Sequence, residues 1–301
     1  MTETRHSPAY DRIEALLTAD QCVVLDGGVG SEITRRLTGG SSIAQGPGIW
    51  EIYEHTGLVR EVHRDYALAG CDVVSTNTWG LLGGATTERG RKPGRTGLPA
   101  WTAATRDAVR LARQGIAEAG RTGKCAVGFC LNDADPLLVG EQALLALLWS
   151  VDRPDLVLVE TLTAVPSPAL LAAITALAAT GLPVWVSFRR VGPPAGEEPG
   201  SFPSALSDLD RAGVRAFLVN CIPVERTAGA VTELATATRR PVGCYPRLDE
   251  ALDPATYGEL SQRWRDQGAR IIGGCCGVGP DHVSAVRARF AQGAPTTSGS
   301  A

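Results

Sequence analysis

Three cysteines offer the clearest chemistry in this 301-residue sequence. Cys275 and Cys276 are adjacent, lie between glycines and follow the apolar residues 271–272, whereas Cys221 ends a second apolar run, residues 216–221. Adjacent side chains point to opposite sides of a regular strand, but the flanking glycines let the backbone turn both sulfurs to one side. Three thiolates at the ends of two strands can hold one zinc ion and leave its fourth tetrahedral position open.

An open position among sulfur ligands favours a thiol as the incoming substrate, because a thiol that binds the metal loses its proton and becomes a nucleophile. Two other interpretations remain: buried packing cysteines, or a closed structural zinc site. A closed site needs a fourth ligand, and Cys244 is a candidate, although its position before Tyr245 predicts that it points elsewhere. The other cysteines are predicted to pack in the core: Cys22, Cys71, Cys125 and Cys130.

The composition indicates a globular protein of a reducing compartment. Apolar residues make up 44% of the chain, and a formal net charge of −3 argues against general attraction to nucleic acid or membranes. Eight cysteines are too sparse for a disulfide scaffold, the first residues form no hydrophobic targeting core, and the apolar stretch 143–151 is too short to span a bilayer. We therefore expect a cytoplasmic protein with small-molecule partners. The sequence predicts no particular oligomeric state.

Short apolar runs rich in β-branched residues alternate with helix-like segments along the chain. Their continuous apolarity is typical of strands covered on both faces. Eight such units in about 270 residues predict an α/β fold, a single (β/α)8 TIM barrel. The rival is a doubly wound open sheet, but residues 26–31 do not match its phosphate-binding glycine pattern. The predicted strands are residues 23–26, 73–76, 126–130, 156–161, 184–188, 216–221, 242–245 and 270–274.

We expect one catalytic domain over residues 20–290, between an N-terminal extension (1–19) and a disordered tail (291–301). Two long connections, 79–101 and 189–204, are predicted to be loops that are either solvated or cover the barrel mouth. The helix of the short third unit is predicted at 140–150, and the histidines are predicted to be structural: His55, His63 and His282.

Polar or thiol side chains follow nearly every predicted strand. Because the C-terminal ends of the strands meet at one face of a TIM barrel, these side chains are candidates for the site. In chain order they are Asp26, Asn77, Thr78, Asn132, Glu160, Ser187, Asn220, Cys221, Tyr245, Cys275 and Cys276.

Two carboxylates and two glycines in this set would suit the charged ends of an amino acid. Asp26 could cap a helix, but together with Glu160 it could also bind an ammonium group. The sterically open amides of Gly27 and Gly28 could bind a carboxylate.

The sequence also resembles the zinc-dependent homocysteine S-methyltransferases from about residue 20 to residue 290. The most specific combination is Asn220-Cys221 with the glycine-framed pair Cys275-Cys276. Other matching motifs are Leu25-Asp26-Gly27-Gly28, Ser75-Thr76-Asn77-Thr78, Val159-Glu160-Thr161, Trp185-Val186-Ser187-Phe188 and Tyr245-Pro246.

The resemblance implies a (β/α)8 barrel with zinc on Cys221, Cys275 and Cys276. It implies that Asp26 and Glu160 hold the amino group of homocysteine and that the Gly27 and Gly28 amides hold its carboxylate. The expected activity is methyl transfer from a small donor to the zinc-bound thiolate of homocysteine, which gives methionine. Other residues are expected around the metal ligands or on the donor side of the site: Asn77, Thr78, Ser187, Asn220 and Tyr245.

The sequence departs from the family beside the expected donor site. The loop after the third strand, residues 128–133, lacks the usual Gly-Pro, and Arg247 follows Tyr245-Pro246 where the family usually has asparagine. The favoured donors are S-methylmethionine and S-adenosylmethionine, with betaine as a lesser possibility. The alternatives are a methyltransferase for another small thiol or selenol, or a non-catalytic zinc-binding barrel.

Overall fold

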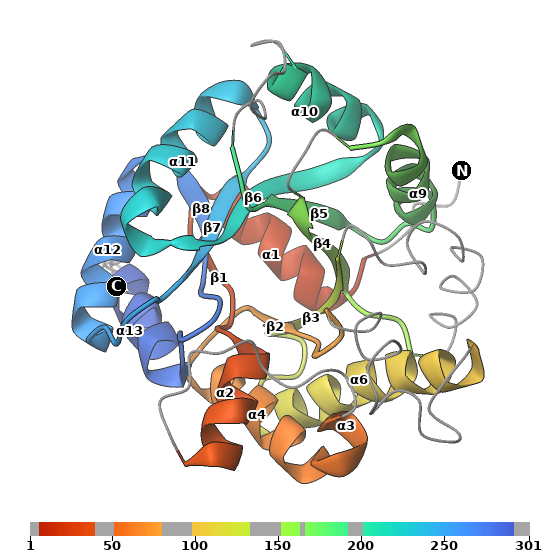
Figure 1. The fold of residues 1–301 in the computed structure, drawn as a ribbon, viewed down its shortest axis with the longest axis vertical. Coiled ribbons are helices and arrows are strands. Elements are labelled where there is room, and N and C mark those ends of the chain that lie inside the picture. Colours follow the sequence, from red (N-terminus) through yellow and green to blue (C-terminus); the bar gives the residue numbers. More distant parts are fainter. Residues whose placement is uncertain are drawn as a thin grey trace, which may run out of the picture.

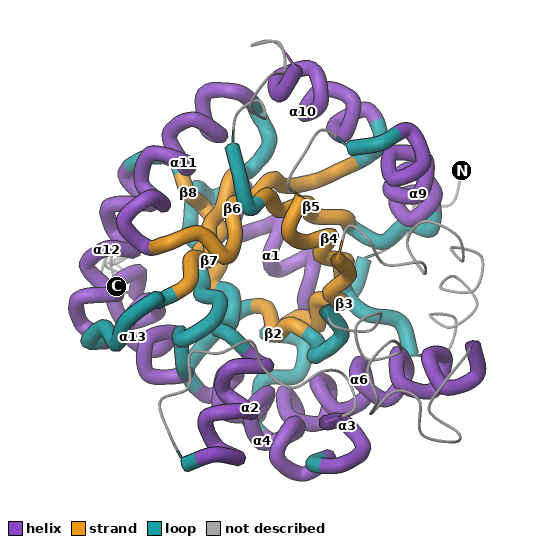
Figure 2. Tube along the Cα trace, viewed as in Figure 1, coloured by secondary structure: helices purple, strands orange, loops and turns teal. Residues whose placement is uncertain are grey.

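A nearly closed barrel of parallel strands forms the centre of the computed structural model, which describes residues 6–39, 51–79, 98–132, 152–162, 166–191 and 201–291. The strands are β1 (Val23–Val24), β2 (Val73–Ser75), β3 (Ala126–Asn132), β4 (Leu156–Leu162), β5 (Val184–Phe188), β6 (Val214–Pro223), β7 (Val242–Arg247) and β8 (Ala269–Ile272). They follow the order β1-β8-β7-β6-β5-β4-β3-β2, and a single parallel bridge between Leu25 and Val73 joins the ends of the sheet (Figure 2). The predicted TIM barrel is confirmed, and the open doubly wound sheet is excluded.

Helices form a ring around these strands (Figure 1). Three of them begin at a side-chain cap, because Ser7, Ser167 and Asp253 each accept a hydrogen bond from the backbone N–H three residues later and precede a proline. The helices are α1 (Pro8–Thr18), α2 (Val29–Thr38), α3 (Glu51–Glu54), α4 (Thr56–Leu68), α6 (Leu98–Glu118), α9 (Pro168–Ala179), α10 (Ser201–Arg211), α11 (Val224–Ala237), α12 (Pro254–Asp266) and α13 (Pro280–Ala291). No helix in the described ranges is both long and apolar enough to cross a bilayer.

Helix α1 covers the N-terminal end of the barrel. Its residues Ala9, Tyr10 and Ile13 are buried in the cluster that fills the barrel interior, and Trp185 Nε1 donates to the Tyr10 hydroxyl at 3.2 Å. Figure 1 shows α1 through the centre of the barrel, behind the strands. The expected N-terminal extension therefore contains a helix that is part of the barrel core, and the C-terminal end of the barrel is left for the site.

All eight predicted strands are present, and the differences lie at their ends. β3, β6 and β7 each run past the predicted end by two residues, whereas β1 is shorter because the chain turns into the glycines at 27–28. The predicted loops 79–101 and 189–204 end earlier than expected, since α6 begins at Leu98 and α10 at Ser201. Residues 80–97, 140–150, 192–200 and 292–301 lie outside the described residues, so the predicted helix in the third unit and the predicted tail are not described.

Candidate metal and substrate site

The three cysteines converge at the C-terminal ends of two strands. Cys221 lies near the end of β6, and Cys275 and Cys276 follow β8. Their sulfur atoms all lie within 4.8 Å of one another, and the sulfurs of Cys275 and Cys276 are 3.9 Å apart. Within the described part of the chain this group includes no fourth His, Cys, Asp or Glu ligand. Three soft sulfur donors without a fourth protein ligand fit a zinc ion with one open position.

A strained backbone places Cys221 in this group. Its φ of 52° lies in the left-handed region, which a non-glycine residue seldom adopts outside turns and functional sites. The register between β6 and β7 shifts between Asn220 and Pro223, so Cys221 leaves the regular hydrogen-bond ladder. Consequently, the sulfur does not follow the side-chain alternation of β6.

The glycines before the cysteine pair let the chain pass close to its neighbours. A Cβ on Gly273 would lie 2.4 Å from Leu25 Cβ, and one on Gly274 would lie 2.1 Å from Val278 Cγ1. Both distances are shorter than any real Cβ contact, so only glycine fits at these positions. This close approach positions Cys275 and Cys276 beside the end of β1, next to the first candidate carboxylate.

The three thiols influence one another's ionisation. Hydrogen bonds from the Cys275 and Cys276 thiols lower the pKa of Cys221, and nearby Arg189 and Arg247 lower it further. The same hydrogen bonds to Cys221 raise the pKa of Cys275 and Cys276. The trio therefore concentrates negative charge on Cys221, and a cation can replace the protons on the other two sulfurs.

Asp26 is buried at the end of the first strand segment. Its Oδ2 accepts from the backbone N–H of Ser75 at 2.6 Å, and its Oδ1 accepts from the Ser75 hydroxyl at 2.7 Å. Burial raises the pKa of Asp26 to about 7, although the hydrogen bonds from Ser75 lower it, and the nearby charge of Glu160 adds to the increase. Asp26 and Glu160 are therefore close enough to influence each other.

Glu160 lies on β4, and the Tyr245 hydroxyl links it to the Ser187 hydroxyl. The Tyr245 hydroxyl lies 2.8 Å from Glu160 Oε1 and 2.6 Å from Ser187 Oγ. The Tyr245 hydroxyl has one hydrogen, so when it donates to the ionised Glu160 it can accept from Ser187. Burial raises the pKa of Glu160 to about 7, although hydrogen bonds from Tyr245 and Cys130 lower it. An ammonium group placed beside both carboxyl groups would stabilise their charged forms.

The glycine pair differs from the expectation in one respect. The Gly28 N–H already donates to the carbonyl of Val278 at 3.0 Å, whereas the Gly27 N–H has no acceptor among the described residues. A Cβ on Gly27 would lie 2.1 Å from Val278 O, so this position also requires glycine. Helix α2 begins directly afterwards, with Gly28 as its N-cap and no side-chain cap. A carboxylate here would meet the Gly27 amide and the N-terminus of α2.

The polar residues expected at lower specificity fall into two groups. Asn77 Nδ2 and Asn220 Oδ1 are buried without a hydrogen-bond partner in the described residues, so both can bind a ligand atom. Thr78 is already occupied, because its hydroxyl donates to the Cys130 carbonyl at 2.6 Å and lies 2.7 Å from the Thr76 hydroxyl.

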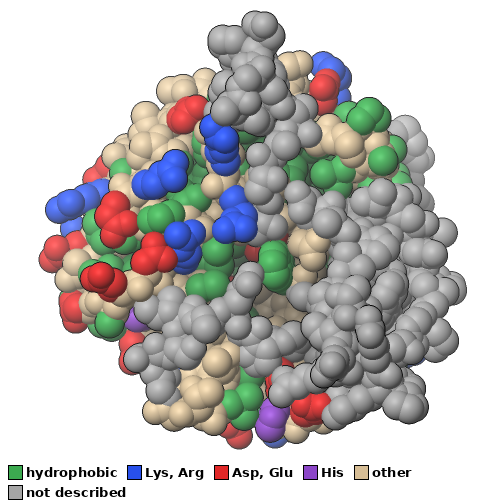
Figure 3. Space-filling model, in the orientation of Figure 1, with side chains coloured by type: hydrophobic (Ala, Val, Ile, Leu, Met, Phe, Trp, Pro, Cys, Tyr) green, Lys and Arg blue, Asp and Glu red, His purple; other side chains and the backbone are tan. Residues whose placement is uncertain are grey.

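Two arginines beside Cys221 and one serine were not predicted as site residues. Arg247 donates to the Cys221 carbonyl at 2.7 Å and to Asp249 Oδ1 at 2.7 Å, and Arg189 is exposed nearby. Figure 3 shows basic side chains gathered over β6, β7 and α11 on this face. The sequence signal for Arg247 was the departure after Tyr-Pro, and the signal for Ser75, which binds Asp26, was its place at a strand end.

The remaining cysteines, His63 and His282 lie outside the sulfur trio, whereas His55 lies 3.5 Å from Glu51 in a group with Glu54 that could itself hold a cation. Cys244 is fully buried between the barrel and the helices, as predicted, and is not part of the trio. His282 accepts from the Gly279 N–H at 3.1 Å and lies 2.9 Å from the Leu252 carbonyl oxygen, whereas burial lowers the pKa of His63 to about 4. The predicted packing cysteines are all buried: Cys22, Cys71, Cys125 and Cys130.

Comparisons with known proteins agree with this geometry. Residues 23–290 match the family model described as homocysteine S-methyltransferase. Homocysteine S-methyltransferase YbgG of Bacillus subtilis is 32% identical over 95 residues, which are 28% of this chain and 30% of that protein. Homocysteine S-methyltransferase of Escherichia coli is 27% identical, over 92% of this chain and 98% of that protein.

Solved structures show the same fold. The homocysteine methyltransferase MmuM from Escherichia coli, crystallised in apo, metallated and oxidized forms, superposes on 92% of this chain and 99% of its own at 24% identity. The TM-score is 0.68 for the apo and metallated forms. Because the family model matches most of the chain, the protein belongs to the homocysteine S-methyltransferase family.

Proposed function

We propose that this protein is a zinc-dependent homocysteine S-methyltransferase, which moves a methyl group from a small activated donor to the thiol of homocysteine and gives methionine. The observation that carries the proposal is the convergence of three sulfur atoms within 4.8 Å at the end of the barrel that also holds two buried carboxyl groups. Family membership supports homocysteine as the acceptor.

Cys221, Cys275 and Cys276 would hold the metal. When bound, zinc lowers the pKa of a thiol at its open position. A free thiol with a pKa near 8.5 is only about 3% thiolate at pH 7, so full deprotonation increases the reactive fraction by about thirtyfold at most. The remaining acceleration must come from residues that align the thiol with the methyl group and the leaving group.

The two carboxyl groups would bind the ammonium group of the acceptor. Ser75 fixes Asp26 through two hydrogen bonds, and Tyr245 orients Glu160. Binding the ammonium group would keep both carboxyl groups ionised, and this charge pairing would position the thiol toward the cysteine trio. The Gly27 amide and the N-terminus of α2 would bind the carboxylate, a different set of donors from the two glycine amides expected from the sequence.

Arg189 and Arg247 restrict the donor. A sulfonium or quaternary ammonium group alone would be repelled by the two guanidinium groups beside Cys221. S-methylmethionine, S-adenosylmethionine and betaine each also carry a carboxylate, which could pair with an arginine while the cationic methyl carrier faces the thiol. We therefore infer a carboxylate-bearing donor.

The protein is proposed to work in the cytoplasm. All eight cysteines are free thiols, which is consistent with a reducing compartment.

The direct test is methyl transfer to homocysteine by zinc-loaded protein, with S-methylmethionine, S-adenosylmethionine and betaine supplied separately. We expect methionine from at least one donor and none from metal-free protein. A parallel panel of cysteine, selenocysteine and homoselenocysteine separates homocysteine from another thiol or selenol acceptor. Transfer by metal-free protein would contradict the mechanism, and a bound zinc that no thiol perturbs, with no turnover, would favour a non-catalytic barrel.

A further inference from the structure

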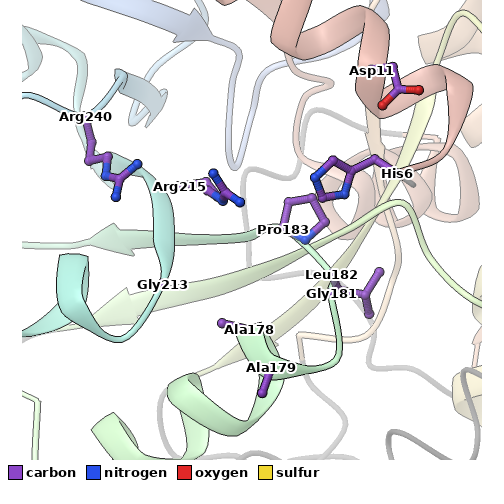
Figure 4. A pocket seen from close by; sticks show the side chains of 10 residues that line it. All are labelled: His6, Asp11, Ala178, Ala179, Gly181, Leu182, Pro183, Gly213, Arg215 and Arg240. Carbon is purple, nitrogen blue, oxygen red and sulfur yellow. The ribbon is translucent and has the colours of Figure 1, made fainter. Parts of the chain in front are cut away.

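A cavity of about 800 Å³ lies at the N-terminal end of the barrel. Its walls come from His6 ahead of α1, α1 itself, the end of α9 and the turn to β5, the start of β6 and the segment before β7 (Figure 4). The cysteine trio lies at the opposite, C-terminal end of the barrel, near the end of β6 and after β8. The cavity is therefore separate from the site described above.

Arg215 is held in this cavity by an irregularity of the sheet. The pairing of β5 with β6 passes from Val184–Val214 to Trp185–Ala216, so Arg215 is left out of the ladder as a β-bulge. It is the only exposed position in β6, and within the described residues its guanidinium group makes no ion pair or hydrogen bond. Bulges redirect side chains, and this one leaves an unpaired cation on a cavity wall.

The other polar groups around the cavity are unequal in charge. Arg240 lies on the same side as Arg215 in Figure 4, but its Nε already donates to Asp210. His6 Nδ1 is buried and has no hydrogen-bond partner among the described residues, and the ring packs edge-on against Tyr10 with centroids 5.2 Å apart. Asp11 is the one carboxylate among the described lining residues and lies beyond His6 in Figure 4.

Small apolar residues complete the walls. Ala178 and Ala179 end α9, and Leu182 and Pro183 lead into β5. The volume is in the range of small-molecule sites, but the lining is more polar than apolar and the cavity is open to solvent on one side, which favours a small polar ligand. A guanidinium fork matches the oxygen pair of a phosphate or a carboxylate.

We propose that this cavity binds a small organic molecule with one oxyanion group, which pairs with Arg215 and is assisted by Arg240 and the free His6 nitrogen. The rest of the ligand lies against Leu182 and Pro183. Asp11 disfavours a polyanion, because a second negative group would face its carboxylate. The site is independent of methyl transfer at the other end of the barrel.

Titration calorimetry on the full-length zinc-loaded protein tests this proposal with inorganic phosphate, glycerol 3-phosphate and butyrate. We expect at least one organic anion to bind with a Kd of about 1 mM or tighter. Stronger binding of glycerol 3-phosphate identifies a phosphate ester, and stronger binding of butyrate identifies a carboxylate. No binding by either organic anion, or binding of inorganic phosphate alone, overturns the proposal.

Matched variants locate the binding. Arg215→Ala should weaken it at least about tenfold, whereas Arg211→Ala, an exposed α10 arginine paired with Asp208 outside the cavity, should leave it unchanged. Ala179→Glu adds a carboxylate to the wall at an exposed position and should also weaken binding, whereas the neutral Ala179→Gln should have little effect. Equal binding by wild type and Ala179→Glu overturns the proposal even if Arg215→Ala does not fold.

Discussion

The two ends of the barrel use buried carboxylates in opposite ways. At the N-terminal end, Asp72 is fully buried and pairs with Arg12 at 2.6 Å and with Arg287, and it also accepts from the Val24 N–H at 2.9 Å. At the C-terminal end, Asp26 accepts from Ser75, and its burial raises its pKa. The first arrangement connects α1 and α13 to the strands. In the second, no cationic side chain pairs with Asp26 among the described residues, as the proposed binding of an ammonium group would require.

Backbone geometry shows the same contrast. At the N-terminal end, Tyr10, Trp185 and their neighbours pack closely, and the Arg215 bulge is the exception. At the C-terminal end, Cys221 has a left-handed φ, and Asn77 and Asn220 have buried polar atoms that find no partner in the part of the chain that the structure describes. Strain and unsatisfied polar groups persist in folded proteins where function requires them. The difference fits a C-terminal end shaped by the proposed substrate site and an N-terminal end that is mostly packed core, with the Arg215 cavity as its one proposed binding site.

The largest effect is expected when the sulfur trio is broken. Cys276→Ala should reduce zinc from about one ion per chain to nearly none, since two thiols hold zinc far more weakly than three, and transfer should fall by at least about a hundredfold. Metal analysis and methionine formation are the measurements. Cys244→Ala is the control, because Cys244 is outside the trio and its variant should keep the metal. Full zinc content in Cys276→Ala would contradict the assignment.

Removing the Asp72 carboxylate tests whether its ion pairs stabilise the N-terminal end of the barrel. Asp72→Asn should lower the free energy of unfolding by about 3–5 kcal/mol, because two arginines lose a buried partner. Urea denaturation measures this loss, and kcat per folded molecule should not change. Asp249→Asn removes the exposed partner of Arg247 and should cost no more than about 1 kcal/mol. Equal losses in the two variants would remove the contrast.

Removing the Asp26 carboxylate at the C-terminal end should impair substrate binding and spare stability. Asp26→Asn should raise KM for homocysteine about tenfold or more, since it loses a charged contact with the ammonium group. It should leave the free energy of unfolding unchanged or higher, because folding no longer buries an ionisable carboxyl group. Steady-state kinetics and urea denaturation together decide the point. A loss of stability as large as that of Asp72→Asn would show that Asp26 is a structural residue.

The raised carboxyl pKa values predict a specific pH dependence. Asp26 and Glu160 have pKa values of about 7 in the folded protein, against about 4 in an unfolded chain. Between these values the folded state holds more protons than the unfolded state, so this contribution to stability falls as pH rises from about 4 to about 7 and is constant above. The difference in the free energy of unfolding between wild type and Glu160→Gln, measured as a function of pH, isolates the Glu160 part of this contribution. KM for homocysteine should fall severalfold, by roughly three- to tenfold, from pH 6 to pH 8 as the carboxyl groups ionise.

The smallest effect is expected at Arg247. Arg247→Asn should raise KM for the methyl donor about two- to fivefold, as expected for a partly exposed charge pair, and leave KM for homocysteine unchanged. Kinetics with each substrate varied in turn separate the two. A selective change in KM for homocysteine would place Arg247 on the acceptor side instead.

The strands and the site residues at their ends were predictable for a physical reason. Buried parallel strands are continuous apolar runs, and a TIM barrel brings the residues that follow them to one face. Asp26, Glu160 and Cys221 could therefore be placed from their positions after such runs.

The remaining features depend on contacts between distant parts of the chain. The Gly28 amide is used by the Val278 carbonyl, which lies 250 residues later. The packing of α1 against Trp185 and the bulge at Arg215 arise from tertiary fit, which neither apolar pattern nor turn residues encode. The role of Arg189 also depends on its distance from Cys221 in the folded protein.

The most direct test of the central claim is the number of sulfur ligands on the bound metal, measured by zinc-edge X-ray absorption with and without homocysteine. We predict three sulfur ligands in the free protein and four after homocysteine is added. The increase should be lost when the protein has first been saturated with methionine, which would compete with homocysteine for the site. A sulfur count that does not change on addition of homocysteine would contradict the account.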